Sequence, residues 1–217
     1  MKKFFTIIPL QIRGQLQTAH YIPAGNSLLD MEGEIAFPIL AAINGYAQPG
    51  EEIRVIAIAT DTDYTVPSRE RFVKDTEALC EKKGVLLPRG VEVIVVPNNP
   101  SVNGQIGVFS RLIKEVEDND ELFSCMTFGT KPLSMALTMA IHYAYRIKKN
   151  ASISCLVYGE VDRSSNPYVY RIYDMTALPQ LDELVHTLAE SKIEHPEQLI
   201  DALFHMGSQT DDDAPEC

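Results

Sequence analysis

The chain has 217 residues, of which 45% are hydrophobic and 23% are charged, and its net charge is −11. This length suits one globular α/β domain with an appendage and is sufficient to bury a core. No apolar run reaches the roughly 18 residues that span a bilayer, and the residues before Gln11 lack a signal-peptide pattern, so we expect a cytoplasmic protein without membrane contact.

The cysteines and the charge distribution exclude further classes. The four cysteines lie far apart without a CxxC pair, so the sequence predicts no metal site, no redox motif and no cofactor. Residues 178–217 contain ten acidic residues and one basic residue, whereas residues 1–177 are nearly neutral. We therefore expect no broad basic surface for long DNA or RNA, while a local cationic pocket for a small anion is compatible with this distribution.

Strand-like and helix-like segments alternate along the chain. In chain order, we predict a strand at 3–9, a helix at 34–46, a strand at 53–60, a helix at 66–83, a strand at 91–96, a helix at 102–117, a strand at 122–127, a helix at 131–149 and a strand at 152–158. Continuous apolar strands that alternate with helices indicate a Rossmann-like, doubly wound, mostly parallel sheet covered on both faces.

The C-terminal part differs from this alternation. Only residues 159–168 separate the strand at 152–158 from a last strand at 169–173, which is too short for a helical crossover. Their turn chemistry predicts a β-hairpin, so the sheet is expected to end in an antiparallel edge. Helices are predicted at 181–188 and 196–206. The expected organisation is a domain at 1–177, a helical extension at 178–206 and an acidic disordered tail at 207–217.

Two loops are the expected ligand-binding elements. In a doubly wound sheet, ligands bind beyond the carboxyl ends of the strands, where the strand order reverses. With an order of 3-2-1-4-5, the loops at 9–30 and 127–132 leave the two strands at that point. The first loop is long for its type and offers polar side chains. These are Gln11, Arg13, Gln15, Gln17, Asn26 and Ser27.

The second loop, TFGTKP, has the features of an anion site. Gly129 permits a tight turn, and Lys131 adds a charge to the free amide groups at the start of the next helix. No GxGxxG follows the first strand and no GxxxxGK[ST] is present, so the dinucleotide and nucleoside-triphosphate motifs are both absent. On these residues alone, an anion site and an ordinary strand-to-helix turn are equally favoured.

The same segments resemble a known family. The turn from Thr127 to Pro132, the Met- and Ala-rich helix after it, and the strand that runs into Tyr158-Gly159-Glu160 resemble the second characteristic motif of CRISPR-associated Rossmann-fold (CARF) domains. The segment from Val169 to Thr176 is also similar, and Pro9-Leu10-Gln11-Ile12-Arg13 stands where the first family motif occurs. The resemblance covers about residues 1–190.

The resemblance implies a homodimer that binds a cyclic oligoadenylate of four or six nucleotides, made by type III CRISPR complexes, across its two-fold axis. It implies ligand contacts from Gln11 and Ile12 in the first loop. In the second loop it implies contacts from Thr127, Gly129, Thr130 and Lys131. The neighbouring residues that complete the predicted site are Pro9, Leu10, Arg13, Asn26, Phe128 and Pro132.

Whether the chain is an enzyme stays open at this point. Some CARF domains are ring nucleases, in which a ribose 2′-hydroxyl attacks the adjacent phosphate without a metal, and Lys131 would then be catalytic. Gln11 stands where several such enzymes have a hydroxyl residue, which favours binding over cleavage. We therefore expect a binding module, either free-standing or the sensor part of a larger effector. The alternatives are a slow ring nuclease and another Rossmann-like nucleotide-binding regulatory domain.

Overall fold

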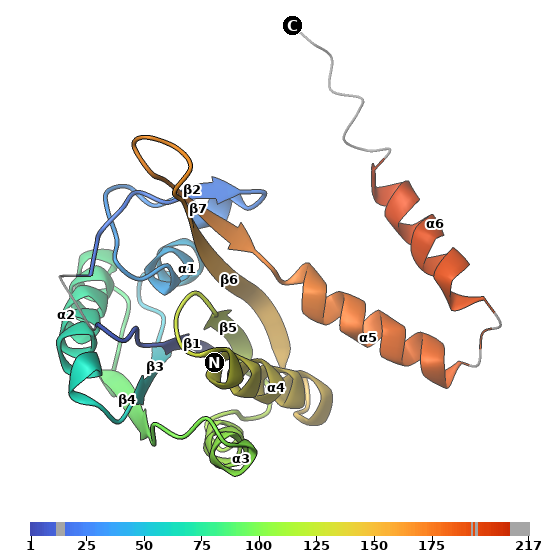
Figure 1. Ribbon diagram of the computed structural model, residues 1–217, viewed down its shortest axis with the longest axis horizontal. Helices are drawn as coiled ribbons and strands as arrows, with labels where there is room; N and C mark the ends of the chain where they lie inside the picture. Colours follow the sequence, from blue (N-terminus) through green and yellow to red (C-terminus); the bar gives the residue numbers. More distant parts are fainter. Residues whose placement is uncertain (12–15, 192, 194, 209–217) are drawn as a thin grey trace, which may run out of the picture. The chain divides into compact units, whose positions relative to one another are not determined.

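The computed structural model describes residues 1–11, 16–191, 193 and 195–208, and the side chains up to residue 202 (Figure 1). The chain divides into two compact units, Met1–Thr176 and Ala177–Cys217. Ile12, Arg13 and Gln15 of the predicted site lie outside the described residues, as does most of the tail predicted at 207–217.

The first unit is built on a seven-stranded, mostly parallel sheet with the order β2-β7-β6-β5-β1-β3-β4. Only the β6–β7 pair is antiparallel among its strand pairs in the described residues. This arrangement confirms the predicted Rossmann-like α/β fold and places β1 between β3 and β5. The strands are β1 (Lys2–Ile7), β2 (Ile22–Ala24), β3 (Ile53–Thr60), β4 (Val91–Val96), β5 (Glu121–Cys125), β6 (Ser152–Asp162) and β7 (Val169–Asp174).

Helices cover both faces of the sheet because its central strands are apolar on both sides. Phe4 stacks on Phe123 with ring centroids 4.4 Å apart, in the cluster that includes α1 and α2. Phe5 points to the opposite face, where it joins α3 and α4 in a second cluster. Figure 1 shows these two pairs of helices on opposite sides of the sheet. The helices are α1 (Ile39–Tyr46), α2 (Val66–Lys83), α3 (Val102–Leu112) and α4 (Lys131–Ile147), with short 3₁₀ turns η1 (Ser27–Leu29) and η2 (Asp63–Thr65).

Two of the predictions about this unit are wrong because of pairing between distant segments. The helix expected from Glu34 begins at Ile39, because Ile35 instead exchanges backbone hydrogen bonds with Ala19 and because Pro38 disfavours helical backbone at the residue before it. The hairpin was expected to form the edge of the sheet, but β2 pairs in parallel with β7 outside it. This edge strand comes from the loop after β1, and it contains Pro23, which edge strands tolerate.

The second unit consists of α5 (Ala177–Glu190) and α6 (Pro196–Ser208), somewhat longer than the helices predicted there. None of the helices that the structure describes is long and apolar enough to cross a membrane.

Charged side chains are paired at the amino ends of the central strands. The fully buried Lys3 lies 2.7 Å from Asp120 and donates a hydrogen bond to the carbonyl of Glu115. Beside it, Arg54 donates two hydrogen bonds, of 2.7 and 2.8 Å, to the carboxylate of Glu92. These pairs lie opposite the edge at which the ligand loops emerge, so they concern stability.

The Arg54–Glu92 pair predicts a pH dependence of stability. Hydrogen bonds from Arg54 hold the pKa of Glu92 below its usual value. The carboxylate therefore stabilises the fold above the pKa of an unfolded glutamate, and this contribution is lost as the pH falls through the lowered folded value. We expect Glu92→Gln to reduce stability at neutral pH and to flatten the acid side of the curve, measured by urea denaturation down to about pH 3. Glu52→Gln, at an exposed position, should leave the curve parallel to wild type, whereas a parallel curve for Glu92→Gln would contradict the assignment.

Candidate functional site

The loop between β5 and α4 folds against the carboxyl end of β1. Gly129 has a φ of +102°, a conformation that side-chain-bearing residues rarely adopt. A Cβ at this position would lie 2.7 Å from Cγ2 of Ile7, the last residue of β1. Glycine is therefore required both by the backbone conformation and by the close approach of the two segments, and the two predicted loops do meet at this edge of the sheet.

Thr127 and Phe128 fix the inner side of this loop. The hydroxyl of Thr127 accepts a 2.7 Å hydrogen bond from the backbone N–H of Gly159 and lies 3.2 Å from Sγ of Cys125. Phe128 packs edge-on against Phe37 at a centroid distance of 6.4 Å. The side chain of Thr127 thus ties the end of β5 to β6.

The outer side of the loop is exposed and positively charged. Thr130 is the N-cap residue of α4, but its side chain makes no capping hydrogen bond. Lys131 begins the helix with an exposed side chain, and Pro132 follows in the first turn. Because the side chain of Thr130 does not cap the helix start, the free amide groups there add a partial positive charge to that of Lys131.

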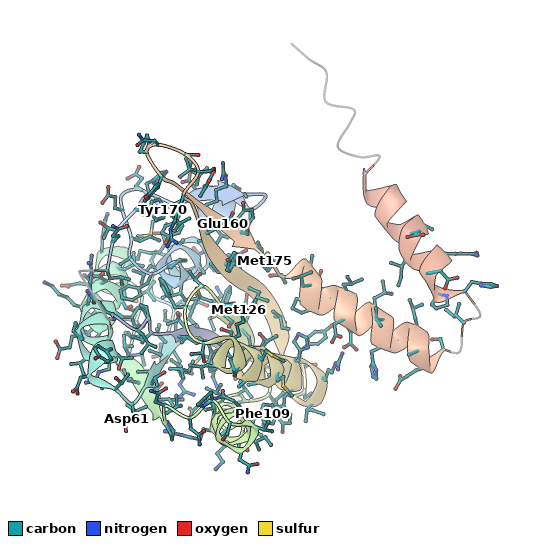
Figure 2. All side chains as sticks on the ribbon, in the orientation of Figure 1. Asp61, Phe109, Met126, Glu160, Tyr170 and Met175 are labelled. Carbon is teal, nitrogen blue, oxygen red and sulfur yellow. The ribbon has the colours of Figure 1, made fainter. Side chains whose placement is uncertain are left out.

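A cavity of about 250 Å³ lies next to this loop. Four segments line it: the loop after β1, the segment before α1, the loop before α4 and the β6–β7 hairpin. Figure 2 shows Tyr170 and Glu160 on the two neighbouring strands of that hairpin. The lining residues are Leu10, Gln11, Leu16, Gln17, Tyr21, Ala36, Phe128, Val161, Arg163, Tyr168 and Tyr170.

Hydrogen bonds hold the polar side chains of the cavity in place. Gln11 donates its backbone N–H to the carbonyl of Tyr64 at 2.8 Å, and its Oε1 accepts a 3.3 Å hydrogen bond from Ser68. The hydroxyl of Tyr170 donates to Oε1 of Gln17 at 3.1 Å. The wall is therefore formed by amide and aromatic groups, with no acid–base pair among the described lining residues.

Two tyrosines form the aromatic wall at the back of the cavity. Tyr21 meets Tyr170 edge-on, with ring centroids 5.5 Å apart. Burial raises the pKa of Tyr21 to about 12, so its hydroxyl stays protonated at neutral pH. Tyr21 can therefore donate a hydrogen bond to a ligand, but it cannot serve as a base.

A structured turn presents Arg163 and Tyr168 at the mouth of the cavity. Asp162 accepts hydrogen bonds from the side chain and backbone of Ser164 and from Ser165, which lower the pKa of Asp162 to about 2. Arg163 follows directly and forms no ion pair with a carboxylate in the part of the chain that the structure describes. This guanidinium is exposed and can bind an anion.

The structure brings together only part of the predicted site. Leu10, Gln11 and Phe128 line the cavity, and Gly129, Thr130 and Lys131 lie next to it in the chain, whereas Pro9 is buried. Asn26 lies elsewhere: its Nδ2 donates to the hydroxyl of Tyr46 at 2.8 Å and to Asp174 at 2.6 Å, and its Oδ1 accepts from the N–H of Leu28. These bonds commit the side chain of Asn26 to the connection between η1 and β7.

The hairpin contributes site residues that were not predicted from the sequence. Cys125, the last residue of β5, pairs with Val157, so β6 continues past β5 to Asp162 and carries the turn over the ligand edge. The alternation of polar and apolar side chains from Tyr158 to Asp162 is the signal of this longer strand.

The described residues contain no cluster of three or more His, Cys, Asp and Glu side chains suited to a metal. Comparison of the chain with protein-family models found no match, and comparison with curated proteins found none either. The class that fold and site define is a Rossmann-like α/β domain with a partly aromatic, partly cationic cavity at the switch point of its sheet.

Proposed function

We propose that this chain is a CARF-type sensor that binds a cyclic oligoadenylate across a homodimer, in cytoplasmic type III CRISPR antiviral signalling. The observation that carries the proposal is the pairing of an aromatic cavity with a cationic helix start at one edge of the sheet. An oligoadenylate presents bases that stack on aromatic rings and phosphates that bind cations.

The phosphates have three sources of positive charge at this edge. Lys131 is exposed at the start of α4, and Arg163 is exposed at the tip of the hairpin. The uncapped amide groups of α4 supply the third. Because these charges are local and the chain as a whole is acidic, they favour a small anionic ligand over a long nucleic acid.

The adenine bases have aromatic partners in the cavity. Tyr168 is 54% exposed at its mouth, so one ring face is available to a base. Stacking of a base on an aromatic side chain contributes about 1–3 kcal/mol. The amide groups of Gln11 and Gln17 lie in the same cavity, where they can meet the polar edge of a base.

A two-fold partner is supported by the outer surface of α4. Met135 and Met139 lie one helical turn apart and are 65% and 58% exposed. Such an apolar stripe on the helix that begins at the phosphate site suits contact with the same helix of a second copy. A symmetric ring would then meet one Lys131 from each subunit.

Titration calorimetry of the chain with cyclic tetra-adenylate and cyclic hexa-adenylate tests the proposal. We expect tight binding of one ring and a loss of about tenfold or more for Lys131→Ala, since a charge-assisted hydrogen bond contributes about 1.5–3 kcal/mol. Lys149→Ala removes the same charge just after the other end of α4 and should leave the affinity unchanged. Absence of binding to both rings by the wild-type chain would overturn the proposal.

The same samples address ring cleavage. Labelled ring incubated with excess protein and EDTA is expected to stay intact, because Gln11 supplies an amide where several ring nucleases carry a hydroxyl. Linear products that disappear in Lys131→Ala would instead assign the chain as a metal-independent ring nuclease.

A further inference from the structure

The β4 edge of the sheet is open. β4 spans six residues, VEVIVV, and it is the last strand in the sheet order: among the described residues no strand pairs with it on the side away from β3 (Figure 1). Val95 is 37% exposed, and the residues before it are only partly covered. Its sequence contains neither proline nor lysine, and its charged residue, Glu92, is paired with Arg54 of β3, so the usual means by which proteins protect such an edge are missing from these six residues.

The opposite edge shows the usual protection. β2 has three residues, and Pro23 in its centre has no N–H to offer another strand. Unprotected backbone N–H and C=O groups are thus found at the β4 edge and not at the β2 edge, and this difference needs an explanation.

The hydrogen-bonding groups of β4 alternate between its neighbour and the open side. The carbonyl of Val96 accepts from the N–H of Asp61 on the β3 side. In a parallel pair alternate residues bond inward, so the backbone groups of Val91, Val93 and Val95 point outward. Arg111 donates to one of these, the carbonyl of Val95, at 2.6 Å. Within the described residues, both backbone groups of Val93 lack a partner on the outer side and can pair with another strand.

A groove of about 430 Å³ runs beside this edge, between β4 and α2. Val73, Val93 and Val95 form its apolar floor, and Arg69 and Glu70 flank it. Neither of these two side chains forms an ion pair within the described residues. A surface with one free charge of each sign can face its own copy without like-charge repulsion.

We propose that β4 pairs antiparallel with β4 of a second copy, so that two sheets join into one. A two-fold axis at Val93 places Val93 opposite itself and Val91 opposite Val95 of the other copy. The three residues whose backbone groups point outward, Val91, Val93 and Val95, are all valines, so the row reads the same in either chain direction. β-Branched residues also pair well across antiparallel strands. This interface differs from the α4 contact of the proposed function and does not depend on a ligand.

Sedimentation equilibrium of the chain with Val93→Pro tests the pairing. Proline removes the outward N–H and leaves the hydrogen bonds to β3 in place, so we expect half the mass of the wild-type assembly with an unchanged far-UV spectrum. Should this variant unfold, Val95→Lys replaces it, because it places a charge in the groove. The matched control is Ile22→Lys on β2, a 50% exposed position at the protected edge, which should keep the wild-type mass.

Met139→Glu separates this interface from the dimer of the proposed function. If both interfaces form and close into a tetramer, each single variant is a dimer with half the wild-type mass, and the Val93→Pro/Met139→Glu double variant is a monomer. A reduced mass for Val93→Pro together with a wild-type mass for Met139→Glu supports the β4 pairing and overturns the α4 dimer. A wild-type mass for folded Val93→Pro, or for Val95→Lys, overturns the β4 pairing. As a second readout, exchange of the Val93 amide hydrogen should slow as protein concentration rises.

Discussion

Replacing Lys3 with methionine is expected to lower the free energy of unfolding by about 3–5 kcal/mol, because the buried carboxylate of Asp120 loses its nearest cation and is left to the N-terminal ammonium group, which lies 3.6 Å away. Lys3 has no exposed surface, and Asp120, 2.7 Å away, is 2% exposed. Methionine has a similar length, so little packing is lost and the effect reports the charge. Urea denaturation measures it directly.

Two further variants make the Lys3 result specific. Lys2→Met removes the neighbouring cation, which donates to the carbonyl of Tyr46 and pairs with the partly exposed Glu51, and it should cost clearly less than Lys3→Met. Adding Asp120→Asn to Lys3→Met should recover part of the loss, because the amide oxygen still accepts from the N–H of Glu117. A cost for Lys3→Met no greater than that for Lys2→Met would show that the buried pair is not a major source of stability.

Gly129→Ala is expected to cost about 2–3 kcal/mol, from an unfavourable backbone conformation and from overlap with Ile7. It should also displace the start of α4, so that Lys131 loses its position next to the cavity. Denaturation measures the first effect, and titration with the cyclic oligoadenylate proposed as the ligand measures the second.

Gly107→Ala is the matched control for Gly129→Ala. Gly107 lies exposed within α3, and an added Cβ there meets no atom within 4 Å. Alanine at this position should therefore stabilise the chain by about 0.5–1 kcal/mol and leave ligand binding unchanged. Equal stability of wild type and Gly129→Ala would mean that the loop has room to relax, contrary to the contact with Ile7.

The fold could be predicted because its signals are local. Phe4 and Phe5 are adjacent apolar residues that point to opposite faces, which is the pattern of a strand covered on both sides. The same reasoning failed at Glu34, where a helical spacing of apolar residues continues past Pro38 toward the N-terminus. Ile35 pairs there with Ala19, a long-range contact that outweighs local periodicity.

The part of the site that is formed by a local turn could be predicted from the sequence, whereas the part that depends on contacts between distant segments could not. Gly129 and Lys131 could be predicted as site residues because a tight turn from a strand into a helix needs a glycine and leaves the first helical residue beside free amide groups. The position of Arg163 depends on how far β6 extends past β5, which is a property of the sheet register. Asn26 was predicted in the ligand loop, but its partner Asp174 is 148 residues away in sequence. Side-chain choices that depend on such distant partners are not encoded in a local pattern.

The position of β1 in the middle of the sheet has a consequence for how the protein is made. Its residues pair with β3 on one side and with β5 on the other. More than half of the chain's residues are translated between β1 and β5. At about 5–20 residues per second, β1 waits on the order of ten seconds on the ribosome before its second edge is covered. We expect this apolar strand to be a principal binding site for chaperones during synthesis.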